Sequence, residues 1–186
     1  MLTRWAVFVS GEGSNLQNIL TLESEGELKS QSIELVVANK SCPAIEKAQR
    51  YSKNNVVVDF RNPEVWAELL EVLNQAKIDK IFLLGFMKII SSGFIRSWAK
   101  PIVNLHPSLL PQYKGLQAIE RAFVAKEERM GVSLHEVVAE LDSGPILKQA
   151  ELWRIPGESL EVLTERFHKL EHKLVRDYLL DLDIRP

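Results

Sequence analysis

The chain has 186 residues, of which 46% are hydrophobic and 26% charged, and its formal net charge is −2. This length and apolar content suit one buried core, so we expect a single domain over residues 1–186. The near balance of 23 basic and 25 acidic side chains argues against a nucleic-acid partner. Apolar stretches are far shorter than the ~20 residues of a membrane span, which argues against a membrane partner.

The compartment can be predicted from two further features. The chain has one cysteine, Cys42, so no internal disulfide can form. The N-terminus runs straight into a β-like segment and lacks the apolar core and cleavage site of a secretory signal. Both features predict a cytoplasmic protein.

Along the chain, short β-branched runs alternate with amphipathic stretches of helical period. We expect strands over residues 5–9, 33–38, 55–58, 81–84, 102–106, 132–138 and 146–153. We expect helices after the turn at 10–14, over 44–51, from Pro63 to 73, and over 160–180. The predicted fold class is α/β: a single-domain, Rossmann-like, mostly parallel twisted sheet with helices on both faces and a long C-terminal helix.

Residues 10–15 (SGEGSN) form a glycine-containing turn between a strand and a helix. Glycine lets the backbone approach a ligand closely, and a helix N-terminus presents unpaired N–H groups to an anion. The segment is not a Walker loop, and Leu16 replaces the third glycine of the dinucleotide fingerprint. Residues 10–15 are about equally compatible with a phosphate site and with a plain turn in which Ser14 caps the helix.

The strand over 102–106 carries two polar side chains at its end. Pro107 stops the strand, so His106 should lie where the strand meets a loop. Residues two apart share a face of a strand, so Asn104 and His106 should lie together. An imidazole can move a proton near neutral pH, and an amide can donate to a developing oxyanion. The alternative is that both side chains only satisfy buried backbone groups.

Asp142 lies in the segment ELDSGP, where an aspartate most often simply forms a turn. Beside His106, however, its carboxylate would favour the imidazolium and raise the pKa of His106. Such an acid could protonate a tetrahedral oxyanion or a leaving amine. Asp142 therefore becomes a candidate only as a partner of His106.

A metal site is not expected. His168 and His172 are four residues apart on the last predicted helix and so share a face. No catalytic glutamate of the H-E-x-x-H type lies between them, and no third ligand is evident. A surface or substrate-facing pair is the simpler interpretation.

Four segments carry a resemblance when they are taken in order: residues 10–17, 85–89, 104–111 with Tyr113 and Gly115, and 141–147. Together they resemble the phosphoribosylglycinamide formyltransferase family, folate-dependent enzymes of purine synthesis. The segment NLHPSLLP and the downstream aspartate are shared with the wider formyltransferase superfamily, whereas the turn followed by SNLQ points to this branch. At this length we expect neither the regulatory domain nor the tRNA-binding domain of other superfamily members.

The resemblance implies transfer of a formyl group from 10-formyltetrahydrofolate to the primary amine of 5-phosphoribosylglycinamide, a step of de novo purine (IMP) biosynthesis. It implies small-molecule partners, no metal, and a monomer or homodimer. The catalytic residues would be Asn104, His106 and Asp142. The substrate phosphate would be held by Gly11, Glu12, Gly13, Ser14 and Asn15, and the ribose or glycinamide by Glu171, His168 and Pro107. The folate would be bound by Met87, Lys88, Ile89, Ile90, Asn104, Val138, Ala139, Glu140, Leu141 and Asp142.

Several positions depart from the family pattern. Lys88 stands where arginine is common, Glu12 where asparagine is, Val132 where threonine is, and Gln117 where histidine is. Lys88 keeps the positive charge but loses the fork geometry of a guanidinium. The family's folate-contacting arginine has no clean counterpart, because Pro63 falls near its place.

Two alternatives stay open at this point. The chain could be a formyltransferase of the same superfamily acting on another small amine, such as an amino sugar. It could instead be a catalytically idle nucleotide-binding or scaffold protein that retains the fold. The presence of Asn104, His106 and Asp142 together favours an enzyme.

Overall fold

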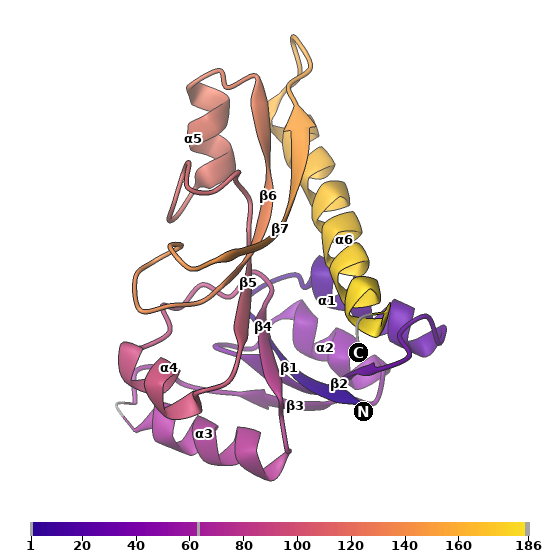
Figure 1. Ribbon diagram of the computed structural model, residues 1–186, viewed down its shortest axis with the longest axis vertical. Helices are drawn as coiled ribbons and strands as arrows, with labels where there is room; N and C mark the ends of the chain where they lie inside the picture. Colours follow the sequence, from indigo (N-terminus) through magenta and orange to yellow (C-terminus); the bar gives the residue numbers. More distant parts are fainter. Residues whose placement is uncertain (1, 63, 185–186) are drawn as a thin grey trace.

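The computed structural model describes residues 2–62 and 64–184, and it is built on one sheet of seven strands (Figure 1). The strand order is β3-β2-β1-β4-β5-β6-β7. The pairs among the first five strands are parallel, and β6 and β7 are antiparallel to their neighbours. The strands are β1 Thr3–Val9, β2 Gln31–Ala38, β3 Asn54–Val57, β4 Lys80–Leu83, β5 Ile102–His106, β6 Arg129–Glu136 and β7 Ile146–Trp153.

Helices cover both faces of this sheet. They are α1 Ser14–Ser24, α2 Pro43–Arg50, α3 Val65–Gln75, α4 Ser92–Trp98, α5 Ala118–Val124 and α6 Leu160–Ile184. Apolar side chains of α1, α2, α5 and α6 pack in one cluster. Those of α3 and α4 pack in a second cluster on the opposite face. The expected α/β class, with a mostly parallel sheet and a long C-terminal helix, is confirmed.

Strand β1 shows how the sequence produces the two layers. Its central residues are apolar without interruption and fully buried. Because side chains alternate along a strand, Trp5 and Val7 join the cluster under α6, whereas Ala6 and Phe8 join the cluster under α3. A fully apolar run is what a central parallel strand requires, since both of its faces are covered.

The order of the strands positions a ligand site. The chain builds β1, β2 and β3 outward in one direction and then returns to place β4 on the other side of β1. Crevices at such a reversal lie outside the carboxyl ends of the strands. Here those ends lead into the glycine turn after β1 and the loop after β4. The amide of Met87 donates a 2.8 Å hydrogen bond to Ser10 Oγ and so ties the two together.

Most predicted elements are present, and three differences stand out. The N-cap of α1 is Gly13, with a left-handed φ of 69°, so the Ser14 cap of the plain-turn alternative is absent: Ser14 is the first helical residue and no side chain caps the helix. Helices α4 and α5 were not predicted. The last helix runs to Ile184 rather than 180. The predicted start of α3 at Pro63 lies outside the described residues.

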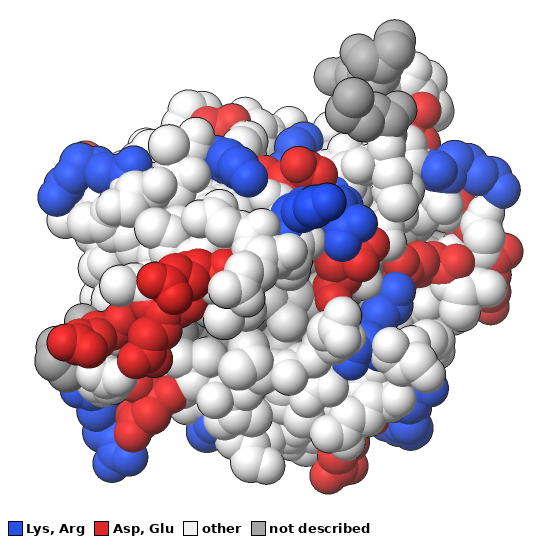
Figure 2. All heavy atoms as spheres, turned by 90° about the horizontal axis from the view of Figure 1, so that it is seen from below, with Lys and Arg blue, Asp and Glu red and all other residues white. Residues whose placement is uncertain are grey.

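The surface carries charges of both signs. Figure 2 shows basic and acidic side chains interspersed over the end of the molecule that points down in Figure 1. Within residues 2–62 and 64–184, no helix is long and apolar enough to cross a membrane.

Candidate active site

A single cleft of about 660 Å³ brings the predicted site residues together. It runs along the carboxyl ends of β1, β4 and β5 and is closed by the turn after β6 and by α6. Its lining includes every residue to which the family resemblance assigned a catalytic or binding role: Gly11, Glu12, Gly13, Ser14, Asn15, Met87, Lys88, Ile89, Ile90, Asn104, His106, Pro107, Val138, Ala139, Glu140, Leu141, Asp142, His168 and Glu171. Their chemical roles stay predictions.

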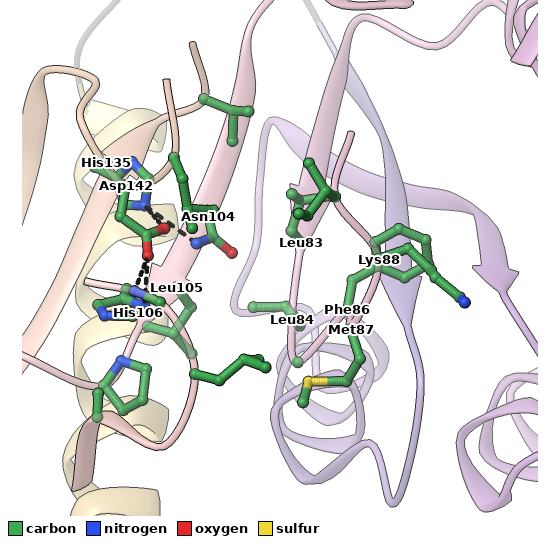
Figure 3. Close-up of a pocket in the computed structure, with 18 of the residues that line it drawn as sticks. Leu83, Leu84, Phe86, Met87, Lys88, Asn104, Leu105, His106, His135 and Asp142 are labelled. Carbon is green, nitrogen blue, oxygen red and sulfur yellow. Dashed lines mark hydrogen bonds and ion pairs between the residues drawn. The ribbon is translucent and has the colours of Figure 1, made fainter. Parts of the chain in front are cut away.

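At one end of the cleft, Asp142 lies between two imidazoles (Figure 3). Its Oδ2 is 3.5 Å from His106 Nδ1, and its Oδ1 is 3.5 Å from His135 Nε2. Asp142 has a φ of 48°, a left-handed conformation that aspartate tolerates better than most residues. The contact between Asp142 and His106, 36 residues apart in sequence, was expected and is present.

His135 is a polar residue of this cluster that the sequence analysis did not single out. In the antiparallel pairing of β5 with β6 it lies opposite Asn104, and its Nε2 is 3.1 Å from Asn104 Nδ2. Its Nδ1 is 2.8 Å from the carbonyl oxygen of Glu136 and therefore carries the proton. The signal available in the sequence was a histidine within the predicted strand VSLHEVV, because a histidine that becomes buried in a strand needs hydrogen-bond partners.

The contact of His135 with the Glu136 carbonyl orients Asn104. With Nδ1 protonated, Nε2 is an acceptor, and the amide of Asn104 donates to it. The same amide group has a second hydrogen, which can serve a ligand in the cleft. His135 therefore acts on the site as a positioning residue for Asn104.

Burial and charge oppose each other at His106. Its side chain is only 8% exposed, and burial lowers its pKa, while the Tyr113 carbonyl and the Asp142 charge raise it. The net shift is downward. Asp142 therefore raises the pKa of His106 as expected, but the net shift is downward because removal from water outweighs the carboxylate.

Asp142 shows the opposite balance. Burial alone would raise the pKa of its carboxyl, but the hydrogen bond from the backbone N–H of Gly115 and the imidazole of His106 lower it, with a net downward shift. The Gly115 amide donates to Asp142 Oδ2 at 2.8 Å. Asp142 is therefore held as a carboxylate, ready to accept a proton or to stabilise an imidazolium.

At the other end of the cleft, the backbone forms the site. Gly13 has a φ of 69°, and a Cβ at this position would lie 2.6 Å from the Cβ of Ala44. The turn is thus packed against α2 so closely that only glycine fits. The start of α1 behind it presents amide groups without intrahelical partners, which suits an anion.

Two polar side chains lie behind this turn. Asn15 Nδ2 donates a 2.9 Å hydrogen bond to Glu171 Oε2, and both side chains are buried. Among the described residues, Asn15 Oδ1 has no hydrogen-bond partner. Burial raises the pKa of Glu171, while the bond from Asn15 and the nearby His168 oppose the shift. A ligand rich in hydroxyl or amide groups would satisfy these atoms.

Between the two ends, the wall of the cleft is apolar. Leu83 and Leu84 are buried at its floor, and Met87, Ile89 and Leu141 are exposed at its rim. Figure 3 shows Met87 and Lys88 on the side opposite the Asp142 cluster. Exposed apolar side chains around a cleft are typical of a site for a flat or partly apolar ligand.

The residues that the structure describes contain no group of three or more histidine, cysteine, aspartate or glutamate side chains arranged to hold a metal ion. His168 lines the cleft beside Glu171, and His172 is not among the lining residues. The helical histidine pair therefore does not converge on one ligand.

Comparison with known proteins gives the family. The model of the family described as formyl transferase matches residues 3–179. The chain belongs to the formyl transferase family. This match covers both ends of the cleft, from the glycine turn to Glu171.

Relatives of this formyl transferase are found by sequence and by structure. It is 31% identical to the phosphoribosylglycinamide formyltransferase of Bacillus subtilis over 92% of this chain and 90% of that protein. It is 38% identical to the trifunctional purine biosynthetic protein adenosine-3 of Drosophila melanogaster, but spans only 13% of that protein's length. Among solved structures, glycinamide ribonucleotide transformylase 1 from Geobacillus kaustophilus matches with a TM-score of 0.91 and 35% identity, over 98% of this chain and 99% of that one.

Proposed function

We propose that this formyl transferase moves a formyl group from 10-formyltetrahydrofolate to the primary amine of 5-phosphoribosylglycinamide. The observation that carries the proposal is the distribution of groups along one cleft. Asp142, His106 and Asn104 lie at one end, and the glycine turn with Asn15 and Glu171 lies at the other. The B. subtilis and G. kaustophilus relatives named above support the same substrate.

The middle and one end of the cleft suit the formyl donor. A pterin is flat, with an apolar face and polar edges, and the cleft offers Leu83 and Leu84 beside the backbone of residues 138–141. Met87 and Ile89 at the rim would cover the ring, and Lys88 offers a positive charge to an acidic part of the folate. When bound there, the folate supplies the formyl carbon.

The other end suits the acceptor. The amides of the glycine turn would bind its phosphate, because they form part of a helix N-terminus and Gly13 allows close approach. Glu171 and Asn15 would bind hydroxyl or amide groups of the ribose and glycinamide. Binding at this end would direct the amine toward Asn104 and His106.

In this proposal, the residues at the Asp142 end of the cleft have separate roles. The amide of Asn104, oriented by His135, donates to the formyl oxygen as negative charge develops there. His106 stabilises the same oxygen once it is protonated, and Asp142 stabilises the resulting imidazolium. Asp142 also assists removal of the amine proton. A carbon–nitrogen bond forms at the amine, the bond from the formyl carbon to N10 of the folate breaks, and N10 takes up a proton.

In this proposal, residues 1–186 act as one catalytic domain in the cytoplasm, and the partners are the two small substrates. The protein can be a monomer or a homodimer, since every residue assigned here comes from one chain.

The test is an assay of the purified protein with 10-formyltetrahydrofolate and a panel of amines. We expect turnover with phosphoribosylglycinamide and little with amines that lack a phosphate. Turnover with an amino sugar alone would show that the acceptor is an amino sugar, while the formyl-transfer reaction would stand as proposed. No turnover with any amine, from a protein that binds folate, would favour an idle binding protein.

A further inference from the structure

The ring of His106 is held from two sides. Its Nδ1 faces Asp142 at 3.5 Å, and its Nε2 is 2.9 Å from the carbonyl oxygen of Tyr113. A carbonyl oxygen can only accept a hydrogen bond, so Nε2 must carry a proton. The neutral ring therefore has its lone pair on Nδ1, directed at the carboxylate of Asp142.

This arrangement determines which ring nitrogen of His106 can take up and release a proton. A lone pair facing a carboxylate is unfavourable, whereas a proton added to Nδ1 converts the same contact into an ion pair. In the opposite tautomer, Nε2 would be unprotonated against the Tyr113 carbonyl, and Nδ1 would already be occupied. The position of the Tyr113 carbonyl thus determines whether Nδ1 is free to take up and release a proton.

The Tyr113 backbone needs support to stay in place. Its φ is 54°, a left-handed conformation that a tyrosine adopts only under constraint. The constraint is on the side chain: Tyr113 OH donates a 2.7 Å hydrogen bond to Glu127 Oε1, beyond the end of α5. The guanidinium of Arg121 lies over the ring, 5.6 Å from its centre, and donates to the carbonyl of Lys114.

We propose that Tyr113 and Glu127 are positioning residues, which fix the tautomer of His106 by holding the Tyr113 carbonyl against Nε2. The functional consequence rests on the proposed formyl transfer, but the tautomer itself does not. Neither side chain is among the residues that line the cleft. The charged or titratable groups that face His106 are Asp142 from the turn after β6, His135 from β6 and Arg121 from α5.

Three variants separate this role from plain structural support. Tyr113→Phe removes only the hydroxyl and keeps the ring under Arg121. Glu127→Ala removes the acceptor, whereas Glu127→Gln keeps an acceptor oxygen and removes the charge. Tyr51→Phe is the matched control, because it removes a tyrosine hydroxyl that binds Gln17 and Thr21 away from His106.

The direct measurement is nitrogen NMR of the histidine rings in the ligand-free protein, which has four histidines to assign. Near neutral pH we expect His106 to be protonated at Nε2, with titration at Nδ1. In Tyr113→Phe and Glu127→Ala, the chemical shifts of both His106 ring nitrogens should move toward the average of the two tautomers. Glu127→Gln and Tyr51→Phe should resemble the wild type. A wild-type His106 protonated at Nδ1 and not at Nε2 would overturn the proposal.

The kinetic measurement tests the consequence. The Tyr113 carbonyl raises the pKa of His106, so its displacement should move the His106 limb of the kcat profile to lower pH. We expect kcat to fall about three- to ten-fold in Tyr113→Phe and Glu127→Ala, as for loss of one hydrogen bond, with acceptor KM little changed. An unchanged tautomer and profile in both variants would contradict the role. If the wild type formylates no amine, the proposed function fails, and the NMR result still decides the tautomer.

Discussion

The two ends of the cleft are built from different parts of the chain. At the Asp142 end, four side chains contact one another, and three of them, His106, His135 and Asp142, are each oriented by a further contact with the backbone. At the glycine turn, the groups offered to a ligand are mostly backbone amides, and the essential side-chain feature is the absence of one at Gly13. The difference suggests that one end performs the chemistry while the other provides affinity.

The largest effect is expected at Asp142. Asp142→Asn keeps the shape of the side chain but removes the negative charge between His106 and His135. General acid–base groups contribute about 10²- to 10⁴-fold, so we expect kcat to fall by that order while folate binding is largely kept. Because the Asp142 charge raises the pKa of His106, its loss should also shift the pH profile of kcat to lower pH. Steady-state kinetics and folate titration would show whether the loss lies in kcat; a loss in folate affinity alone would make Asp142 a binding residue.

A second substitution tests the opposite end. In Gly13→Val the new Cβ meets Ala44 at 2.6 Å in a left-handed backbone, so the turn must move. We expect acceptor KM to rise about ten-fold or more, with a smaller loss of kcat because remote binding also orients the amine.

Gly26→Val is the control for Gly13→Val, since Gly26 has a φ of 70° but open space around its Cβ position. It should lower stability through backbone strain and leave acceptor KM unchanged. If Gly13→Val binds the acceptor as the wild type does, the phosphate lies elsewhere.

Glu171 is expected to give the smallest effect on turnover and a distinct effect on stability. Burial raises its folded-state pKa, so the wild-type protein loses stability as pH rises through that pKa and the carboxylate is charged. Glu171→Gln has no such charge, so its Tm relative to the wild type should increase with pH, by about 2–4 °C per kcal/mol. Acceptor KM should rise several-fold. A Tm difference that does not change with pH would show that ionisation of Glu171 does not destabilise the folded protein.

The fold could be predicted because its signals are local and strong. Runs such as the one from Trp5 to Val9 are apolar without interruption, and β1 is indeed buried on both faces. Helices α4 and α5 were missed because each has only seven residues, too few for a helical period to emerge. Their boundaries depend on a Ser91 cap and on Gln117 in a left-handed conformation, which are details of the folded loops.

The sequence predicted which residues form the site better than it predicted the pKa shifts of those residues. Asn104, His106 and Asp142 stand out through strand spacing, Pro107 and the family resemblance, and they do converge. His135 did not stand out, because its role depends on pairing of β6 with β5, which brings it opposite Asn104. The net downward shift of the His106 pKa could not be predicted, because the depth of burial that outweighs the Asp142 charge is set by the packed structure and has no local signal in the sequence.

The claim that the Asp142 end performs the chemistry is tested most directly by a double-mutant cycle. It compares kcat of His106→Ala, Asp142→Asn and the combined variant with that of the wild type. If the two residues act as one device, as their 3.5 Å contact indicates, the double variant should lose little more activity than either single variant. Losses that multiply would show that His106 and Asp142 act independently, and would contradict a single catalytic unit at this end of the cleft.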